Sequence, residues 1–381
     1  MKPRMNLPSR MAISSTPRLT ILTRLGVVAA LVLASCGSDR EPLSRPDDQR
    51  LLDDADAGRT DAAPVAPSCS SSMTPIERVP VVIQFLVDTS LSMQYGGIWP
   101  ATRQASLASF ADLQATADAS TFIGLSFFPS TYTIRPGSFL DKAHYDSMVE
   151  IIDVSGVGGG TDEYGTTPTY WGLTRAYNVI EAFEPPSNQG LKVSETKRVV
   201  VLLSDGAPTD DSTNRIVPLV KAKYESTPSI RTFSVAILPL AQGQGVDFMG
   251  RVAVAGGTAP AGCEEDSLDV AKVCHFHIVP NGVSDDIRKA LIAALDEIRA
   301  LSASCEFYFT RNDYTDLGDV KVTVTDREGV ATPIPKDAEN GWSFDDDESP
   351  TKVVLRGTSC SAVTGVPSGR VDVELGCRVP R

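Results

Sequence analysis

The sequence is poor in the residues that several common functions need. It carries 35 Lys and Arg against 48 Asp and Glu, a formal net charge of -13, so it lacks the basic surface that binds nucleic-acid phosphates. Only three histidines are present and no Gly-x-Ser-x-Gly segment occurs, which leaves little material for a hydrolase triad. A Gly-x-x-x-x-Gly-Lys-Ser/Thr phosphate loop is also missing. We therefore expect neither nucleic acid nor nucleotide as a ligand, and no enzyme activity.

The N-terminal apolar run is too short for a stable transmembrane helix. Basic residues up to Arg24 precede the apolar residues 25–34, about half the length that a spanning helix needs. The run leads into Leu-Ala-Ser-Cys, which resembles the bacterial lipobox, with Cys36 as the lipidated residue. We predict a lipoprotein signal peptide over residues 1–36 and a membrane anchor on Cys36, and Gly37 in place of Asp indicates the outer membrane. The alternatives are an ordinary secretory signal in which Cys36 is incidental and an unusually short anchor helix.

Six cysteines remain after Cys36, an even number that suits disulfide pairing in an exported chain. Proximity along the chain favours two local bridges, which leaves a third pair across the ends of the main domain. The expected pairs are Cys263 with Cys274, Cys360 with Cys377, and Cys69 with Cys305. The alternative is that one or more of these cysteines are free, buried thiols.

Composition changes twice along the chain. Residues 37–75 are rich in Asp, Ala, Arg, Pro and Ser with almost no aromatics, so they cannot bury enough apolar surface to fold, and we predict a disordered tether. Residues 76–304 form the main domain by their alternating strand and helix patterns. Residues 305–381 contain short alternating segments separated by Gly, Pro, Asp and Asn, which predict a small β-rich appendage.

The main domain alternates buried strands with amphipathic helices. The continuous apolar runs 79–87 and 198–203 are typical of strands covered on both faces, and helical spacing follows in 101–117 and 169–183. Further candidate strands lie at 122–128, 230–238 and 274–279, with a short edge strand at 132–134, and further candidate helices lie at 215–224, 246–255 and 284–301. This alternation predicts an α/β fold with a doubly wound, mostly parallel, Rossmann-like sheet, whose ligands bind beyond the carboxyl ends of the strands.

Three polar segments fall at that edge of the predicted sheet. Asp88-Thr89-Ser90-Leu91-Ser92 follows the first strand, Ser204-Asp205-Gly206 follows the strand at 198–203, and Thr166-Thr167-Pro168-Thr169 opens a helix. Together they resemble the metal-ion-dependent adhesion site of von Willebrand factor type A domains, and the resemblance covers about residues 79–303. The closing segment, with Gly341-Trp342 and Gly376-Cys377, looks like the tail of lipoproteins of this type that are common in myxobacteria.

The resemblance implies a divalent cation and a way of binding a partner. Hydroxyls of Ser90, Ser92 and Thr167 would coordinate the ion directly, while Asp88 and Asp205 would act mostly through water. Oxygen ligands of this kind suit Mg²⁺, with Mn²⁺ or Ca²⁺ as alternatives. The cation would then accept a carboxylate from a partner protein.

Each proposed ligand also has an ordinary structural explanation. The serines and Thr167 could cap the helices that follow them, Asp205-Gly206 could form a plain turn, and Thr166 competes with Thr167 as a ligand. The loop 155–165 is rich in glycine but lacks the third glycine of a dinucleotide fingerprint.

Two other clusters attract attention. His275 and His277 share one face of a strand beside Cys263 and Cys274, which would suit zinc, although an edge strand with two partly exposed imidazoles beside a disulfide is favoured. The acidic residues 345–348 would suit Ca²⁺, although a solvated hairpin tip is favoured. The sequence thus predicts a metal-dependent protein-binding module on an envelope lipoprotein. The alternative is a scaffold subunit whose metal is structural and whose appendage makes the contacts.

Overall fold

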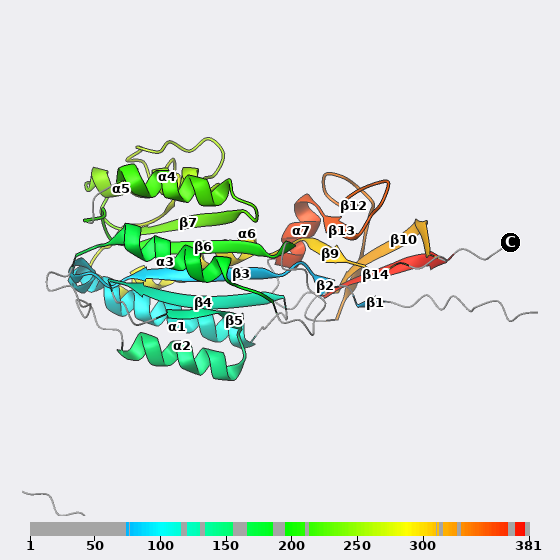
Figure 1. Cartoon of the computed structure of the whole chain (residues 1–381), viewed down its shortest axis with the longest axis horizontal. Coiled ribbons are helices and arrows are strands. Elements are labelled where there is room, and N and C mark those ends of the chain that lie inside the picture. The colour runs from blue at the N-terminus through cyan, green and yellow to red at the C-terminus, as the bar shows by residue number, and fades with distance from the viewer. Residues whose placement is uncertain are drawn as a thin grey trace, which may run out of the picture. The chain divides into compact units, whose positions relative to one another are not determined.

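A computed structural model describes residues 74–75, 77–115, 120–129, 134–154, 166–185, 195–209, 213–309, 311, 315–325, 329–364 and 370–377. Its main feature is a six-stranded sheet in the order β5-β4-β3-β6-β7-β8 (Figure 1). All neighbouring pairs are parallel except β4 and β5. The strands are β3 (Val81–Asp88), β4 (Thr121–Phe128), β5 (Ile134–Phe139), β6 (Lys197–Ser204), β7 (Ile230–Ile237) and β8 (Phe276–Ile278).

The central strands are mostly apolar and are buried along almost their whole length because both of their faces are covered. All eight residues of β3 are buried, as are seven of the eight in β6. Helices α1 (Ile98–Ala115), α2 (Lys142–Val154) and α6 (Ser284–Ser302) pack on one face of the sheet, and helices α3 (Thr169–Glu181), α4 (Thr213–Tyr224) and α5 (Gly243–Ala255) on the other. This arrangement confirms the predicted α/β, doubly wound and mostly parallel sheet.

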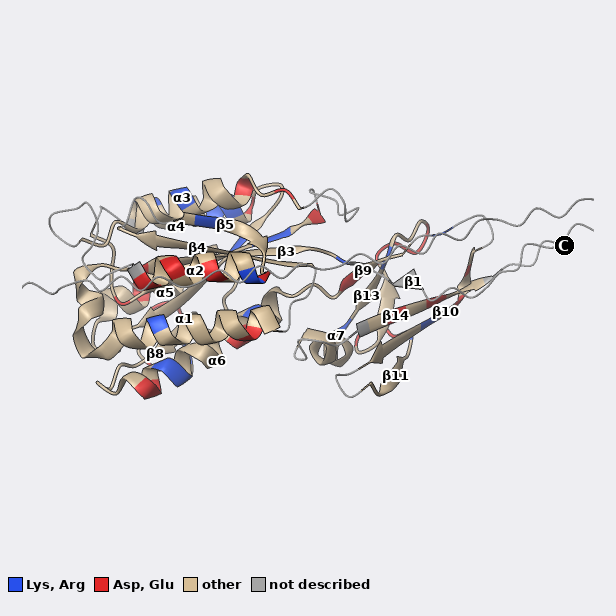
Figure 2. Ribbon diagram, turned by 90° about the horizontal axis from the view of Figure 1, so that it is seen from below, with Lys and Arg blue, Asp and Glu red and all other residues tan. Residues whose placement is uncertain are grey.

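The charges lie on the outer surfaces of the helices. Figure 2 shows both signs of charge on α2 and α6, where ion pairs such as Lys142 with Asp146 and Arg288 with Asp285 run along the helix. Among the described residues, no helix is both long and apolar enough to cross a membrane.

Some elements differ from the sequence prediction. Helix α2 was not predicted, although Met148, Ile151 and Ile152 are buried at helical spacing. A short 3-10 helix, η1 (Leu91–Gly97), follows β3 and is fixed by the buried side chain of Met93. The edge strand expected at 132–134 instead runs over Ile134–Phe139, with residues 132–133 outside the described part.

Two four-stranded sheets make up the β-rich part. One has the order β1-β14-β10-β11 and the other β12-β13-β9-β2. The strands are β1 (Thr74–Pro75), β2 (Glu77–Arg78), β9 (Glu306–Tyr308), β10 (Thr315–Thr325), β11 (Ala331–Ile334), β12 (Trp342–Phe344), β13 (Lys352–Leu355) and β14 (Arg370–Cys377), with helix α7 (Gly357–Thr364) after β13. Side chains including Phe307, Val353 and Val373 form a core of their own.

The β-rich part is not built from the C-terminal residues alone. β1 pairs with β14, and β2 pairs with β9, so residues assigned above to the tether and to the main domain add strands to both C-terminal sheets. The chain therefore passes through these sheets before it enters β3 and returns to them after α6. The rest of the predicted tether and the signal peptide with Cys36 lie outside the described residues.

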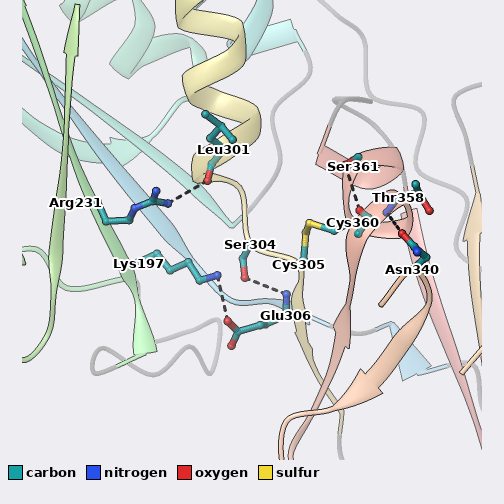
Figure 3. The surroundings of a disulfide bond; sticks show 11 residues. Lys197, Arg231, Leu301, Ser304, Cys305, Glu306, Asn340, Thr358, Cys360 and Ser361 are labelled. Carbon is teal, nitrogen blue, oxygen red and sulfur yellow. Dashed lines mark hydrogen bonds and ion pairs between the residues drawn. A yellow bond between two sulfur atoms is a disulfide. The ribbon is translucent and has the colours of Figure 1, made fainter. Parts of the chain in front are cut away.

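The disulfides confirm one expected pair and correct the other two. Cys263 bonds to Cys274, as predicted. Cys305 bonds to Cys360, so the expected pairs Cys360–Cys377 and Cys69–Cys305 are wrong (Figure 3). Proximity in sequence misled the prediction, because Cys305 and Cys360 are 55 residues apart and meet only when α7 packs beside the end of α6. Cys69 lies outside the described residues.

Charged residues link the start of β6 to the C-terminal sheets. Lys197 pairs with Glu306 at 3.2 Å (Figure 3), and Lys352 pairs with both Glu306 and Glu195. The Tyr308 hydroxyl donates to Glu195 at 2.5 Å. These contacts are partly buried, and they join the segment just after Cys305 to the start of β6.

Candidate metal centre

The three polar segments predicted to converge do meet at the carboxyl edge of the six-stranded sheet. β3 and β6 are neighbours with Val87 opposite Leu203, so Asp88 and Ser204 leave the sheet side by side. Thr167 precedes α3, which packs closely over β4, because a Cβ on Gly172 would lie only 3.0 Å from the Phe128 ring. The close approach at Gly172 therefore places the start of α3 beside the strand ends.

Asp88 is fully buried and held from two sides. The Ser90 backbone N–H donates to its Oδ1 at 2.7 Å, and the Ser204 hydroxyl donates to its Oδ2 at 2.5 Å. Burial, followed by the nearby charge of Asp205, raises the pKa of Asp88 to about 7 despite these hydrogen bonds. The carboxylate is therefore positioned firmly, but its negative charge is poorly compensated.

Ser90, Ser92 and Asp205 form a continuous row of oxygens. The hydroxyls of Ser90 and Ser92 are 3.0 Å apart, and the Ser92 hydroxyl donates to Asp205 Oδ1 at 2.8 Å. Ser90 is buried while Ser92 is exposed, so the row runs from the interior to the surface. Burial also raises the pKa of Asp205, although the hydrogen bond from Ser92 opposes this shift.

Thr167 is fixed by Thr209, a residue of the loop that follows β6. The Thr167 N–H donates to Thr209 Oγ1 at 2.6 Å, and the Thr209 N–H donates to the Thr167 carbonyl at 3.0 Å. Thr167 is buried, whereas Thr166 is only half-buried. The loop after β6 therefore locks the threonine segment beside Asp205.

The structure shows no helix capping by the side chains that directly precede η1 and α3. Ser90 stands at the N-terminus of η1 but makes no side-chain capping hydrogen bond there. The residue that precedes α3 is Pro168, which likewise gives no side-chain cap. The hydroxyls of Ser90 and Ser92 bond instead to one another and to Asp205.

The donor set fits a small, hard cation. Within the described residues, Asp88 and Asp205 contact no Lys, Arg or His, so two buried carboxylates stand together with only hydroxyls and backbone N–H groups around them. Adjacent oxygens of an octahedral Mg²⁺ shell, with metal–oxygen distances of about 2.1 Å, are about 3.0 Å apart. The Ser90–Ser92 separation of 3.0 Å matches that edge. A divalent ion would also compensate the charge that raises both pKa values.

The two rival clusters do not form metal sites in the described part of the chain. No group of three or more His, Cys, Asp and Glu side chains there could hold an ion. His275, just before the edge strand β8, and His277, within it, share a 2.9 Å contact between Nε2 and Nδ1 beside the Cys263–Cys274 bridge. His275 is buried rather than partly exposed, which corrects the expectation for this pair.

The acidic residues 345–348 stabilise a turn. Asp345 accepts hydrogen bonds from the N–H groups of Thr351 and Lys352, and Asp346 accepts from those of Glu348 and Ser349. These carboxylates accept hydrogen bonds from backbone N–H groups between β12 and β13. This agrees with the interpretation of the segment as a hairpin tip.

Comparison with known proteins gives similarity of fold only. No protein-family model matches the sequence, and no curated protein matches it. The pilus adhesin SpaC from Lactobacillus rhamnosus GG is 13% identical over 79% of this chain and 39% of the adhesin, with a TM-score of 0.44, so the chain spans about two fifths of that protein. Proximal thread matrix protein 1 from the mussel byssus, with a zinc-occupied MIDAS motif, is 14% identical over 61% of this chain and 50% of the matrix protein, with a TM-score of 0.36. Manganese-loaded Plasmodium vivax TRAP protein is 13% identical over 73% of this chain and 94% of the TRAP chain, also with a TM-score of 0.36.

Proposed function

We propose that this chain is a non-enzymatic, metal-dependent protein-binding module of an exported lipoprotein. A divalent cation, Mg²⁺ by preference, binds to the hydroxyls of Ser90, Ser92 and Thr167 and, through water, to the carboxylates of Asp88 and Asp205. The bound cation accepts a carboxylate from a partner protein. A lipid on Cys36 anchors the chain in the outer membrane, and the residues before β1 act as a tether.

One observation carries the metal-binding part of this proposal. Two buried carboxylates meet a row of hydroxyls at the carboxyl edge of a parallel sheet, with no basic side chain against either carboxylate among the described residues. Burying a charged carboxylate without compensation is costly, and two together are more costly. Neutral hydroxyl ligands leave a bound cation electrophilic, so that it retains affinity for a further carboxylate.

Two disulfides support the exported location. Cys263–Cys274 and Cys305–Cys360 would not persist in a reducing cytoplasm. They agree with the signal peptide expected over residues 1–36, and lipidation of Cys36 is tested by mass spectrometry of the N-terminal peptide from membranes.

Isothermal calorimetry of Mg²⁺ against the protein tests the metal site. We expect saturable binding that is lost in Asp88→Asn, since that change removes a charge without changing the side-chain size. Asp153→Asn is the matched control, because Asp153 is an exposed carboxylate on α2 paired with Arg103. No heat with wild type at millimolar Mg²⁺, or equal binding by Asp88→Asn, would contradict the proposal.

The cation preference is tested in the same titration with Ca²⁺. Oxygens around Ca²⁺, at about 2.4 Å from the ion, are about 3.4 Å apart along an octahedral edge, wider than the Ser90–Ser92 separation of 3.0 Å. We therefore expect Mg²⁺ and Mn²⁺ to bind more tightly than Ca²⁺.

A further inference from the structure

An exposed arginine that contacts no carboxylate among the described residues lies on the rim of the candidate metal centre. Arg215 is in the first turn of α4, and its guanidinium carbon lies 4.0 Å from the centre of the Tyr170 ring. Among the described residues no carboxylate contacts it, whereas exposed cations elsewhere, such as Arg103 and Lys142, are paired with acids. The net charge of the chain is -13, and Arg215 places a positive charge at this edge of the sheet.

The chain brings Arg215 to the rim by the same contacts that hold Thr167. Thr167 and Thr209 are joined by two hydrogen bonds, Tyr170 follows Thr167 by three residues, and α4 begins at Thr213. Three residues span at most about 10 Å, so the Tyr170 backbone lies within about that distance of the Thr167 backbone. The segment that leads from Thr167 into α3 and the segment that leads from Thr209 into α4 thus meet again where the Arg215 side chain covers the Tyr170 ring.

The stacking on Tyr170 prepares Arg215 for a carboxylate. A guanidinium held over an aromatic ring loses little of its donor capacity, because its N–H groups point outward in the plane of the fork. The ring also limits the rotamers of a long side chain, so less entropy is lost when an acid binds. The N-termini of α3 and α4 add positive potential at the same edge.

We infer that Arg215, held by Tyr170, is a second anchor for the partner, whose recognised segment therefore carries two acidic residues. One carboxylate binds the cation and the other binds Arg215. The inference rests on the proposed function, since the first carboxylate needs the bound cation. An extended peptide advances about 3.3 Å per residue, so acidic residues two to four positions apart place their backbones about 7 to 13 Å from one another, and these are the spacings to test.

The chain offers a matched control for Arg215. Arg175 lies 4.7 Å over the Trp171 ring, the same kind of arginine–aromatic contact, but farther along α3 from the candidate metal centre. Replacement of Arg175 removes the same charge and the same kind of contact without touching the rim.

Synthetic peptides on a biosensor surface test the inference with the full chain. The probes are Gly-Ser peptides that carry one aspartate, or two aspartates two, three or four positions apart, each measured with Mg²⁺ and with EDTA. At least one two-aspartate peptide is expected to bind wild type and Arg175→Ala about two- to fivefold more tightly than the one-aspartate peptide, the range of an exposed charge pair. In Arg215→Ala this advantage is expected to disappear while calorimetric Mg²⁺ affinity stays unchanged.

The outcomes separate the two proposals. Mg²⁺-dependent binding without an advantage for any two-aspartate peptide overturns the second anchor and leaves the proposed function intact. An advantage that persists in Arg215→Ala, or that Arg175→Ala also loses, likewise overturns the role of Arg215. Failure of every peptide to bind in an Mg²⁺-dependent way overturns both.

Discussion

Thr167 and Thr209 hold each other through two hydrogen bonds, from the Thr167 N–H to Thr209 Oγ1 at 2.6 Å and from the Thr209 N–H to the Thr167 carbonyl at 3.0 Å. The proposed threonine ligand thus owes its position to a side chain on another loop. Thr209→Val keeps the shape and removes the acceptor, so we expect the Mg²⁺ affinity to fall by about two- to tenfold, the value of one hydrogen bond. Calorimetry measures this change.

The control for Thr209 is Thr174→Val. The Thr174 hydroxyl donates to the Tyr170 carbonyl at 2.7 Å within α3, away from the proposed ligands. An equal loss of Mg²⁺ affinity in both variants would show that Thr209 has no particular role in positioning Thr167.

The pair of buried carboxylates predicts opposite stability effects with and without metal. In EDTA, Asp88→Asn is expected to melt at a higher temperature than wild type, because it removes the repulsion between Asp88 and Asp205. The new amide can still accept from the Ser90 N–H and donate to the Ser204 hydroxyl, which is able to reverse its role. With Mg²⁺ at 100 times its Kd, wild type gains about 2.7 kcal/mol and the variant gains nothing.

Thermal denaturation in EDTA and in Mg²⁺ measures this reversal. Ser267→Ala, on the loop beside Cys263 and Cys274, serves as a substitution away from the carboxylates and is expected to respond to Mg²⁺ like wild type. A variant that is less stable than wild type in both buffers would show that Asp88 is structural.

The sequence predicted those parts of the molecule that depend on local pattern. β3 and β6 are continuous apolar runs, and the polar residues at their ends had to meet because parallel neighbours end at one edge. The pairing of β1 with β14 could not be predicted, since two residues of strand carry no periodicity. Nor could the Cys305–Cys360 bridge, which depends on how α7 packs.

The site itself divides in the same way. Asp88, Ser90, Ser92, Thr167 and Asp205 were named from sequence. The structure joins Asp88, Ser90, Ser92 and Asp205 by hydrogen bonds and places Thr167 against the loop that follows Asp205. The hydrogen bonds of Thr209 and the stacking of Arg215 on Tyr170 were missed, because each joins segments whose spacing along the chain gives no signal.

The Cys305–Cys360 bridge is expected to stabilise the C-terminal sheets more than the other bridge stabilises its loop. Cross-linking across 55 residues is worth about 4 kcal/mol in a chain-entropy account, against about 3 kcal/mol across the 11 residues between Cys263 and Cys274. Urea denaturation of Cys305→Ala/Cys360→Ala beside Cys263→Ala/Cys274→Ala compares the two losses. Non-reducing peptide mapping is expected to recover Cys305 linked to Cys360, and a Cys360–Cys377 peptide would contradict the structure.

The buried histidine pair predicts a loss of stability in acid. Burial, followed by the proximity of His277, lowers the pKa of His275 to about 3, and burial also lowers the pKa of His277. His275 Nδ1 is buried without a hydrogen-bond partner among the described residues, so a proton added there would find no acceptor, whereas the Leu238 backbone partly offsets the effect of burial on the pKa of His277. Below an unfolded pKa of about 6.5 the unfolded chain binds more protons than the folded one, and stability falls as the pH drops from 6.5 toward 3.

The size of this effect is bounded by the number of protons. His275 contributes a slope that approaches about 1.4 kcal/mol per pH unit within that window, and His277 adds to the slope in the same direction. In His275→Leu/His277→Leu this contribution is absent. Leucine side chains suit this position because Val273, two residues before His275, belongs to the apolar core that includes α5. Urea midpoints from pH 7.5 to pH 4.5 are therefore expected to decline less steeply in the variant than in wild type. The two proteins have the same carboxylates, so this difference reports the histidines. If the midpoints of the two proteins declined in parallel, the folded and unfolded chains would bind protons equally at these imidazoles, and the prediction would be wrong.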